Sequence, residues 1–314
     1  MYTSIVVPLD GSEFGVRALP VALTLAKRCN ARVHLVHVRE AVVFLEGETA
    51  YEPHLSDQQQ QKVRAHVTAM AAQLARGASL RVDAVFLDGP VAPSLQRYLE
   101  TGGHDLVVMT THGRGGLSRA WLGSVADGLI RRAPVPLLLL RDDTAWLRDA
   151  VEPLFRRVLI PLDGSAMAEE VLDHVVSLGT NGVTEYVLLS VIAPHHQVDS
   201  GESDAETLAG HSLDERQRDA AHHYLNGVAS NLRSSGALVK ERVEVHRHTA
   251  QGILYAATEH HVDVIALSTH GRGGRARFMH GSVADKVLRG ADLPVFAYRP
   301  KQAGVEQPQS AWSR

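Results

Sequence analysis

The chain has 314 residues, of which 45% are hydrophobic and 21% are charged, and its formal net charge is −3. This composition excludes a largely disordered chain and predicts a folded protein of two domains. The weak net charge argues against general binding of nucleic acid, and no apolar run reaches the ~20 residues of a membrane helix. Cys29 is the single cysteine, so no intramolecular disulfide can form. With no signal-peptide pattern at the start, we expect a cytoplasmic protein.

Predicted strands and helices alternate along the first half of the chain. Strands are expected at 5–9, 31–38, 80–87, 106–110 and 135–140, because these runs are short, apolar and rich in β-branched residues. Helices are expected at 13–28, 57–76, 92–100 and 125–132, with an irregular segment at 40–56. This alternation predicts a doubly wound parallel sheet with helices on both faces.

The second half repeats this order. Strands are expected from 158, then at 184–192, 239–245, 262–268 and 295–298, and helices at 168–177, 212–233 and 252–260. Residues 195–211 are expected to form an acidic, His-rich insert, and 301–314 a frayed tail. We therefore predict two α/β domains, 1–142 and 155–300, joined by a linker at 143–154.

A glycine-rich motif occurs once in each half. Thr-His-Gly-Arg-Gly-Gly at 111–116 is followed by Gly-Ser-Val-Ala-Asp at 123–127, and both stretches recur 158 residues later, at 269–274 and 281–285. In each copy the loop leaves a predicted buried strand and ends at the start of a predicted helix. Free backbone N–H groups and the helix dipole attract anions at such a place, so the motif predicts a phosphate site.

Asp-Gly-Ser follows the first strand of each half, with the acids at Asp10 and Asp163. In a doubly wound sheet ligands bind at the carboxyl ends of the strands, so these acids and the glycine loops are expected to share one crevice. The alternative is that each acid caps the next helix and that the glycines only form turns. A P-loop is excluded because its Lys is absent, and the Gly-x-Gly-x-x-Gly dinucleotide pattern is not completed.

These motifs resemble those of the universal stress protein family, with Val-Pro-Leu-Asp-Gly-Ser at 7–12, Thr-His-Gly-Arg-Gly-Gly and Gly-Ser-Val-Ala-Asp. The resemblance covers both halves, so the chain resembles a tandem member. It implies a Rossmann-like, five-stranded sheet of order 3-2-1-4-5 in each half. It also implies pairing of the halves through their last strands into an intramolecular pseudo-dimer, with a homodimer as a further option. The implied ligand is ATP, with or without Mg²⁺, and the implied role is regulation in the stress response.

Carried over from the family, the implied nucleotide-binding residues lie at four places in the fold. The phosphate loop comprises Thr110, Gly113, Arg114, Gly116, Gly123, Ser124 and Val125, and in the second copy Gly271, Gly281 and Ser282. Asp10 and Asp163 fall near the nucleotide sugar, Val38 and Val191 beside the adenine, and Gly89 in a turn next to the nucleotide. The chain departs from the family at the leading glycine of the loop, where Thr110 and Ser268 stand.

The two halves differ before the helix that follows the third strand. The offset of 158 places Arg247 and His248 opposite Gly89 and Pro90. Side chains there would narrow an adenine slot, so the second site is expected to be weaker or empty.

Several alternatives stay open at this point. Arg114 and Arg272 either reach a phosphate or face solvent, and His112 and His270 either fix the loop or take part in chemistry. His246 and His248 lie two apart on a predicted strand and, together with His222-His223 or His260-His261, could bind a metal ion. No ligand set, however, has the spacing of a structural zinc site. From the resemblance, we expect an ATP-binding protein with a regulatory role. Two alternatives stay open: a slow ATPase or adenylyl-transferring enzyme, and a scaffold that acts without nucleotide.

Overall fold

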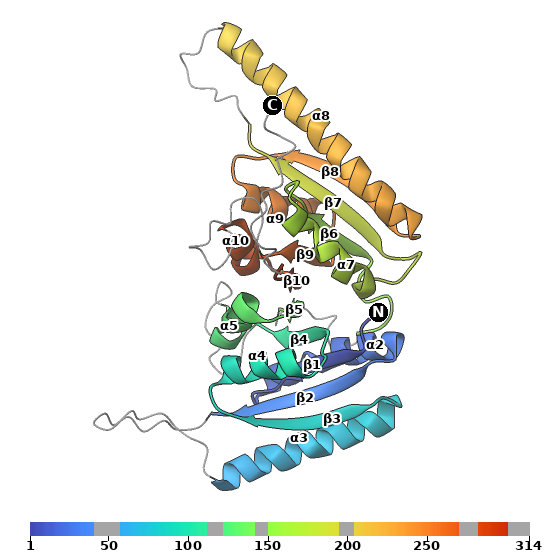
Figure 1. Cartoon of the computed structure of the whole chain (residues 1–314), viewed down its shortest axis with the longest axis vertical. Helices are drawn as coiled ribbons and strands as arrows, with labels where there is room; N and C mark the ends of the chain where they lie inside the picture. Colours follow the sequence, from blue (N-terminus) through green and yellow to red (C-terminus); the bar gives the residue numbers. More distant parts are fainter. Residues whose placement is uncertain (41–56, 112–121, 142–149, 195–203, 270–281, 301–314) are drawn as a thin grey trace, which may run out of the picture. The chain divides into compact units, whose positions relative to one another are not determined.

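The computed structural model describes residues 1–40, 57–111, 122–141, 150–194, 204–269 and 282–300 (Figure 1). The chain divides into two compact units, Met1–Val151 and Glu152–Arg314. The segment expected to be irregular and the expected tail lie outside the described residues, apart from residue 40. The expected pairing of the two halves through their last strands stays a prediction.

The first unit contains five parallel strands in the order β3-β2-β1-β4-β5. The strands are β1 (Ser4–Pro8), β2 (Arg32–Arg39), β3 (Val82–Asp88), β4 (Leu106–Thr110) and β5 (Leu137–Leu140). The helices are α1 (Glu13–Val16), α2 (Leu19–Cys29), α3 (Asp57–Ala78), α4 (Val91–Thr101) and α5 (Ser124–Arg132). The central strand β1 is buried on both sides, since Ile5, Val6 and Val7 have no exposed surface. This burial explains the continuous apolar run that marks the strand in the sequence.

The second unit repeats this architecture, with parallel strands in the order β8-β7-β6-β9-β10. The strands are β6 (Arg157–Pro161), β7 (Glu185–Ile192), β8 (Leu238–Val245), β9 (Val264–Ser268) and β10 (Val295–Tyr298). The α-helices are α6 (Ala166–Glu169), α7 (Val171–Val175), α8 (Asp204–Ser234), α9 (Thr249–Glu259) and α10 (Ser282–Gly290). The predicted fold class, two repeated doubly wound domains with the order 3-2-1-4-5, is therefore confirmed.

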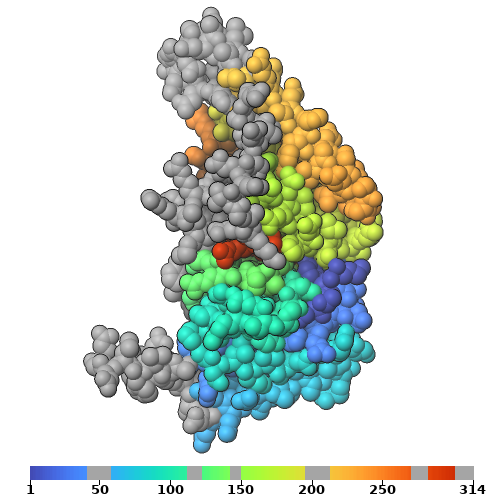
Figure 2. All heavy atoms as spheres, viewed as in Figure 1, coloured from blue at the N-terminus to red at the C-terminus, as the bar shows by residue number. Residues whose placement is uncertain are grey.

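Each sheet carries helices on both faces. On one face of the first sheet the ring of His34 in β2 packs edge-on against Tyr98 of α4, with centroids 6.2 Å apart. On the other face the guanidinium of Arg64 in α3 lies 4.6 Å from the ring centre of Phe86 in β3. Figure 2 shows that α8, coloured orange-yellow, forms a large part of the visible surface of the second unit.

The helix predicted at 13–28 is wrong as a single element. It is divided into α1 and α2, because Pro20 lies in the first turn of α2 and has no N–H to continue the ladder from Val16. The helix predicted at 168–177 is likewise divided, into α6, α7 and a 3₁₀ turn at Val176–Leu178. These breaks let the chain turn sharply after the first strand of each unit.

The expected insert at 195–211 is also partly wrong, since α8 begins at Asp204 and not at residue 212. Residues 195–203 lie outside the described part of the chain. The other predicted boundaries differ from the structure by up to three residues, and those of β4 and β10 agree with it at both ends.

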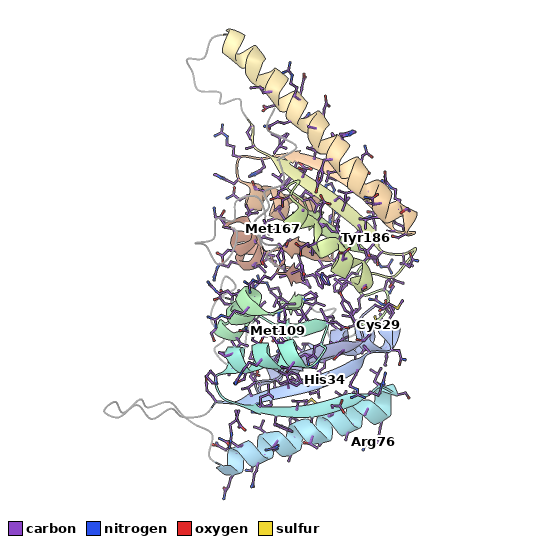
Figure 3. The ribbon with its side chains drawn as sticks, in the orientation of Figure 1. Cys29, His34, Arg76, Met109, Met167 and Tyr186 are labelled. Carbon is purple, nitrogen blue, oxygen red and sulfur yellow. The ribbon has the colours of Figure 1, made fainter. Side chains whose placement is uncertain are left out.

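A cluster of aromatic rings fills the space between β2 and α4 near the amino ends of the strands in the first unit, with His34 labelled in Figure 3. The His104 ring stands 4.7 Å from that of His34 and 4.4 Å from that of Tyr98. The Ser4 hydroxyl lies 2.8 Å from His104 Nδ1, and the Tyr98 hydroxyl 3.0 Å from His34 Nδ1. Burial lowers the pKa of both histidines, and for His104 the neighbouring His34 lowers the pKa further.

These lowered pKa values predict that the first unit loses stability as the pH falls. In the unfolded chain both imidazoles take up protons near their ordinary pKa of about 6.5, whereas in the folded unit they do so only at lower pH. The unfolded state therefore binds more protons within that window, and the free energy of unfolding decreases as the pH falls through it. Urea titrations followed by NMR at β2 amides should show this decrease.

A double variant, His34→Val with His104→Val, should remove most of this pH dependence, because its side chains do not titrate. The matched control is His66→Gln, which changes an exposed histidine on α3 and should leave the pH dependence as in the wild type. A first unit whose unfolding free energy is the same at pH 7.5 and pH 5.5 contradicts the interpretation.

Candidate functional site

The carboxyl ends of β1 and β4 lie side by side in the first unit. The two strands pair in parallel, with Ile5 opposite Leu106 and Val6 opposite Val107. Beyond these pairs, the Thr110 hydroxyl donates to the carbonyl of Phe14 over 3.3 Å and ties the end of β4 to α1. The strands that precede the two motifs are neighbours, so both motifs begin at one edge of the sheet. That they share one crevice stays a prediction, because residues 112–121 lie outside the described part of the chain.

Asp10 organises the turn that leaves β1. Its Oδ1 accepts the backbone N–H of Ser12 at 2.9 Å and the Ser12 hydroxyl at 2.6 Å, and Gly11 adopts φ +79°. Ser12, rather than Asp10, is the N-cap of α1, since its hydroxyl oxygen accepts the N–H of Gly15. Over the described residues, Asp10 Oδ2 has no hydrogen-bond partner.

The corresponding turn of the second unit has the same construction. Asp163 Oδ1 accepts the N–H of Ser165 at 3.0 Å and its hydroxyl at 2.6 Å, and Gly164 has φ +80°. Asp10 is half-buried, whereas Asp163 is exposed. The repeat therefore preserves the turn itself but places its acid in a different environment.

The glycine loop of the first unit is closed at its base. The N–H of Gly123 donates to the carbonyl oxygen of Thr111 over 2.9 Å, so the chain leaves β4 and returns beside it before α5 begins. A Cβ atom on Gly123 would lie 2.9 Å from the same oxygen, so only glycine fits without a shift of the backbone. The other predicted loop residues, Gly113, Arg114, Gly116, Gly271 and Gly281, and the loop histidines lie outside the described residues.

The start of α5 presents backbone donors. Gly123 is the N-cap residue, and no side chain caps the helix. Ser124 is exposed and Val125 is half-buried. Within the described ranges, no acceptor takes the N–H of Ser124 or of Val125. Such an uncapped helix N-terminus attracts an anion, because its donors and the helix dipole point the same way.

Arg141 is a residue that the sequence analysis missed. It directly follows β5, its side chain is buried, and its Nη1 donates to the Thr111 hydroxyl over 3.5 Å. A positive charge thus lies against the base of the glycine loop. The repeat contained a signal for it, because Arg299 directly follows β10 at the same offset of 158 residues.

Val38 and Gly89 lie at the ends of β2 and β3. Val38 is on the same face of the sheet as His34, since strand residues alternate, and this is the face that α4 covers. Gly89 has φ +118°, and its N–H donates to the carbonyl of Arg39 over 2.9 Å. Ser94 then fastens α4 to this turn, because its hydroxyl donates to the Asp88 carbonyl over 3.2 Å.

The turn between β8 and α9 in the second unit has one residue more than the turn between β3 and α4 in the first unit. Arg39 pairs with Asp88 and Ile192 pairs with Val245, so the residue in the place of Gly89 is His246. His248 is the N-cap of α9, as Pro90 is of α4. The alignment of Arg247 with Gly89 by a constant offset is therefore wrong, and Arg247 is the additional residue.

Helix α9 lies close to β7 in this part of the second unit. A Cβ atom on Gly252 would lie 2.8 Å from Val191 Cγ1 and 2.9 Å from His246 Cβ. The first unit has Ser94 at the place of Gly252, since both are the fourth residue of their helices. Helix α9 thus packs directly against Val191 and His246, because Gly252 has no side chain between them.

Two further features bear on the class of site. The described residues contain no cluster of three His, Cys, Asp or Glu side chains arranged to hold a metal ion. Among the helices in the described ranges, none combines the length and the apolar character that a membrane span requires.

The fold and this edge of the sheet define a tandem doubly wound α/β protein in which no side chain caps the N-terminus of α5. The model of the universal stress protein family matches residues 1–141 and 154–299, so the chain belongs to this family. Universal stress protein Rv2005c of Mycobacterium tuberculosis is 28% identical over 304 residues, 94% of this chain and 96% of that protein. The chain is therefore similar to a tandem relative over nearly its whole length.

Two more comparisons agree with this assignment. A universal stress protein of Thermus aquaticus is 33% identical over 143 residues, which cover 45% of this chain and 100% of that protein. The crystal structure of a universal stress protein from Archaeoglobus fulgidus matches with a TM-score of 0.65 at 20% identity, over 95% of this chain and 97% of that one. The structural likeness shows that the fold is shared.

The close approach at Gly123 predicts a large effect of one methyl group. Gly123→Ala should lower the free energy of unfolding by about 1–3 kcal/mol, because Cβ would press on the Thr111 carbonyl and strain the bond that closes the loop. Chemical denaturation measures this change. The matched control is Gly77→Ala on α3, where a Cβ meets nothing within 4 Å. The control should be neutral or stabilising by up to about 1 kcal/mol, and a similar loss in both variants contradicts the prediction.

Proposed function

We propose that this protein binds an adenine nucleotide, ATP with or without Mg²⁺, at the carboxyl edge of the first unit, and that it acts as a cytoplasmic regulator in the stress response. The observation that carries the proposal is the start of α5, where Gly123 closes the loop on Thr111 and, having no side chain, leaves the helix N-terminus without a cap. Phosphate groups are the ligands that such a helix start accepts best. Family membership supports the choice of ATP, since many universal stress proteins bind it.

The residues of the first unit fit the three parts of a nucleotide. The amides of Ser124 and Val125, the Ser124 hydroxyl and the nearby charge of Arg141 suit the phosphates. Asp10 Oδ2 suits the hydroxyl groups of a ribose, while Oδ1 remains bonded to Ser12. The apolar side chain of Val38 and the backbone of the Gly89 turn would contact the adenine. A bound Mg²⁺ would neutralise phosphate charge and would be held mainly by phosphate oxygens.

A regulatory role is proposed rather than a catalytic one. Asp10 is the only carboxylate among the proposed ligands of the first unit, and one of its oxygens already accepts two hydrogen bonds from Ser12. A general base must take a proton from the attacking group, and a carboxylate committed to a structural turn is poorly suited to this step. Binding without rapid turnover is the simplest consequence.

The second unit is proposed to bind nucleotide weakly or not at all. His246 replaces Gly89, Arg247 is added, and Val191 packs against Gly252 where the adenine of a bound nucleotide would need space. Opening this contact would displace side chains from van der Waals contact, which reduces affinity. The Asp163 turn and Ser282 at the start of α10 retain the polar half of the site.

Calorimetric titration of the full-length chain with ATP tests this proposal. Ser124→Ala should weaken binding by about tenfold, or 1.4 kcal/mol, because a hydrogen bond to a charged phosphate is lost. Ser282→Ala is the matched control and should leave the affinity nearly unchanged. The reverse ranking would assign the site to the second unit.

Two other outcomes oppose the proposal as a whole. No binding by the folded wild-type protein would favour a scaffold that works without nucleotide. Many turnovers of ATP per chain, measured as ADP or AMP by chromatography, would favour an enzyme.

A further inference from the structure

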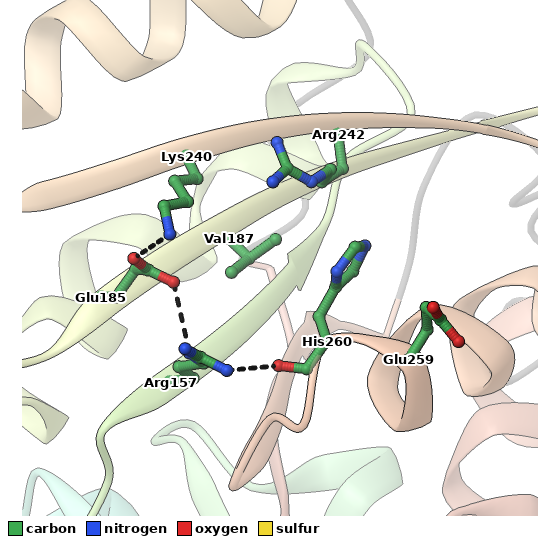
Figure 4. A pocket seen from close by; sticks show the side chains of 7 residues that line it. All are labelled: Arg157, Glu185, Val187, Lys240, Arg242, Glu259 and His260. Carbon is green, nitrogen blue, oxygen red and sulfur yellow. Dashed lines mark hydrogen bonds and ion pairs between the residues drawn. The ribbon is translucent and has the colours of Figure 1, made fainter.

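The second unit contains a cavity of about 170 Å³ at the amino ends of its strands, the edge opposite to the candidate nucleotide site. It lies between strands β6, β7 and β8 and the end of α9 (Figure 4). Six of the residues that line it are Arg157, Glu185, Val187, Lys240, Arg242 and His260. This volume is that of about six water molecules in the liquid, which matches a small molecule.

The internal repeat shows why the cavity exists. His34 pairs with Asp83 in the first sheet and Val187 pairs with Lys240 in the second, so Val187 stands in the place of His34. Helices α4 and α9 have equal length, which puts Ala256 in the place of Tyr98. The aromatic cluster that fills this space in the first unit is thus replaced by small side chains, and the space stays open.

The cavity wall is also more cationic than its counterpart. Lys240 and Arg242 replace Asp83 and Val85 of the first unit. Lys240 Nζ lies 2.7 Å from one carboxylate oxygen of Glu185, and Arg157 Nε 3.4 Å from the other. Both carboxylate oxygens of Glu185 are therefore paired with cationic side chains of the protein, which keeps Lys240 and Arg157 at the cavity wall.

Two donors remain for a ligand. Within the described ranges, Arg242 has no carboxylate partner, and its one hydrogen bond runs from Nη1 to the carbonyl of Glu241 at 2.8 Å. His260 Nε2 is buried without a hydrogen-bond partner in the described part of the chain. The carboxylate of Glu244 is 3.8 Å from this atom, which is an ion-pair distance if the ring is protonated but is beyond hydrogen-bonding distance. Figure 4 shows the His260 ring directed toward Arg242, with Glu259 on the side away from Lys240.

We propose that this cavity is a binding site for a small oxyanion, a molecule that carries a carboxylate or phosphate group. Arg242 binds the anion through its free guanidinium edge, whose geometry matches two oxygens of such a group. His260 Nε2 donates a further hydrogen bond, and Arg157 and Lys240 supply positive charge around it. The site belongs to the second unit alone and is independent of nucleotide binding by the first.

The test uses the full-length protein at constant ionic strength and two separate probes, inorganic phosphate and succinate. NMR signals of the His260 ring and of the Arg242 side chain should shift and saturate with at least one probe. A preference for phosphate identifies a phosphorylated ligand, and a preference for succinate a carboxylate. Phosphate that binds at the glycine loops is distinguished by shifts at the Ser124 or Ser282 amides.

Arg242→Gln should weaken binding at the cavity by about tenfold or more, while Arg216→Gln, an exposed arginine on α8, should leave it unchanged. Val187→His combined with Ala256→Tyr, which copies the first unit, should abolish it. If the double variant Val187→His with Ala256→Tyr does not fold, the comparison of Arg242→Gln with the wild type still tests the proposal. The proposal is overturned if the His260 and Arg242 signals respond to both probes only as they do to chloride, or if Arg242→Gln binds as the wild type does.

Discussion

The hydrogen bond from the Gly123 amide to the Thr111 carbonyl closes the base of the glycine loop at the candidate nucleotide edge of the first unit. It joins the end of β4 to the first residue before α5 over 2.9 Å and leaves no room for a Cβ. Because glycine has no side chain to cap the helix, the amides of Ser124 and Val125 are left at the helix start. The same residue therefore closes the loop and leaves the helix N-terminus uncapped, which is the basis of the proposed anion site.

The two units share one strand order, but their side chains differ at both the carboxyl and the amino edge of the sheet. At the carboxyl edge, the first unit has a glycine turn at Gly89, whereas the second has His246 there and a side chain packed against Gly252. At the amino edge the relation is reversed, since rings fill the first unit and a charged cavity remains in the second. Exchanges of a few side chains thus change the packing at each edge, while the strand order of the two units stays the same.

The sequence predicted the fold well because its strongest signals are local. The apolar runs of β4 and β10 were placed at both ends, and the repeated motifs identified the family and, through it, the strand order. The breaks after α1 and α6 were missed because they depend on how one residue, such as Pro20, interrupts a ladder that the apolar pattern continues. The start of α8 was missed because Gly210 and His211 resemble a loop in composition.

The candidate site was predicted less completely, for physical reasons that sequence spacing does not contain. A constant offset cannot reveal that Arg247 is an added residue, because the strand register and the helix start shift by different amounts. The burial of Arg141 behind Thr111 and the cavity beside His260 depend on side chains from several elements that meet only in three dimensions.

The most direct test of the account is the number of nucleotides bound per chain. Native mass spectrometry of the full-length protein with excess ATP counts bound molecules on each intact chain. The account predicts a single ATP per chain, whose occupancy at limiting ATP falls when Ser124 is replaced by Ala and is unchanged when Ser282 is replaced by Ala. A chain that binds two ATP molecules with similar affinity, or none, contradicts it.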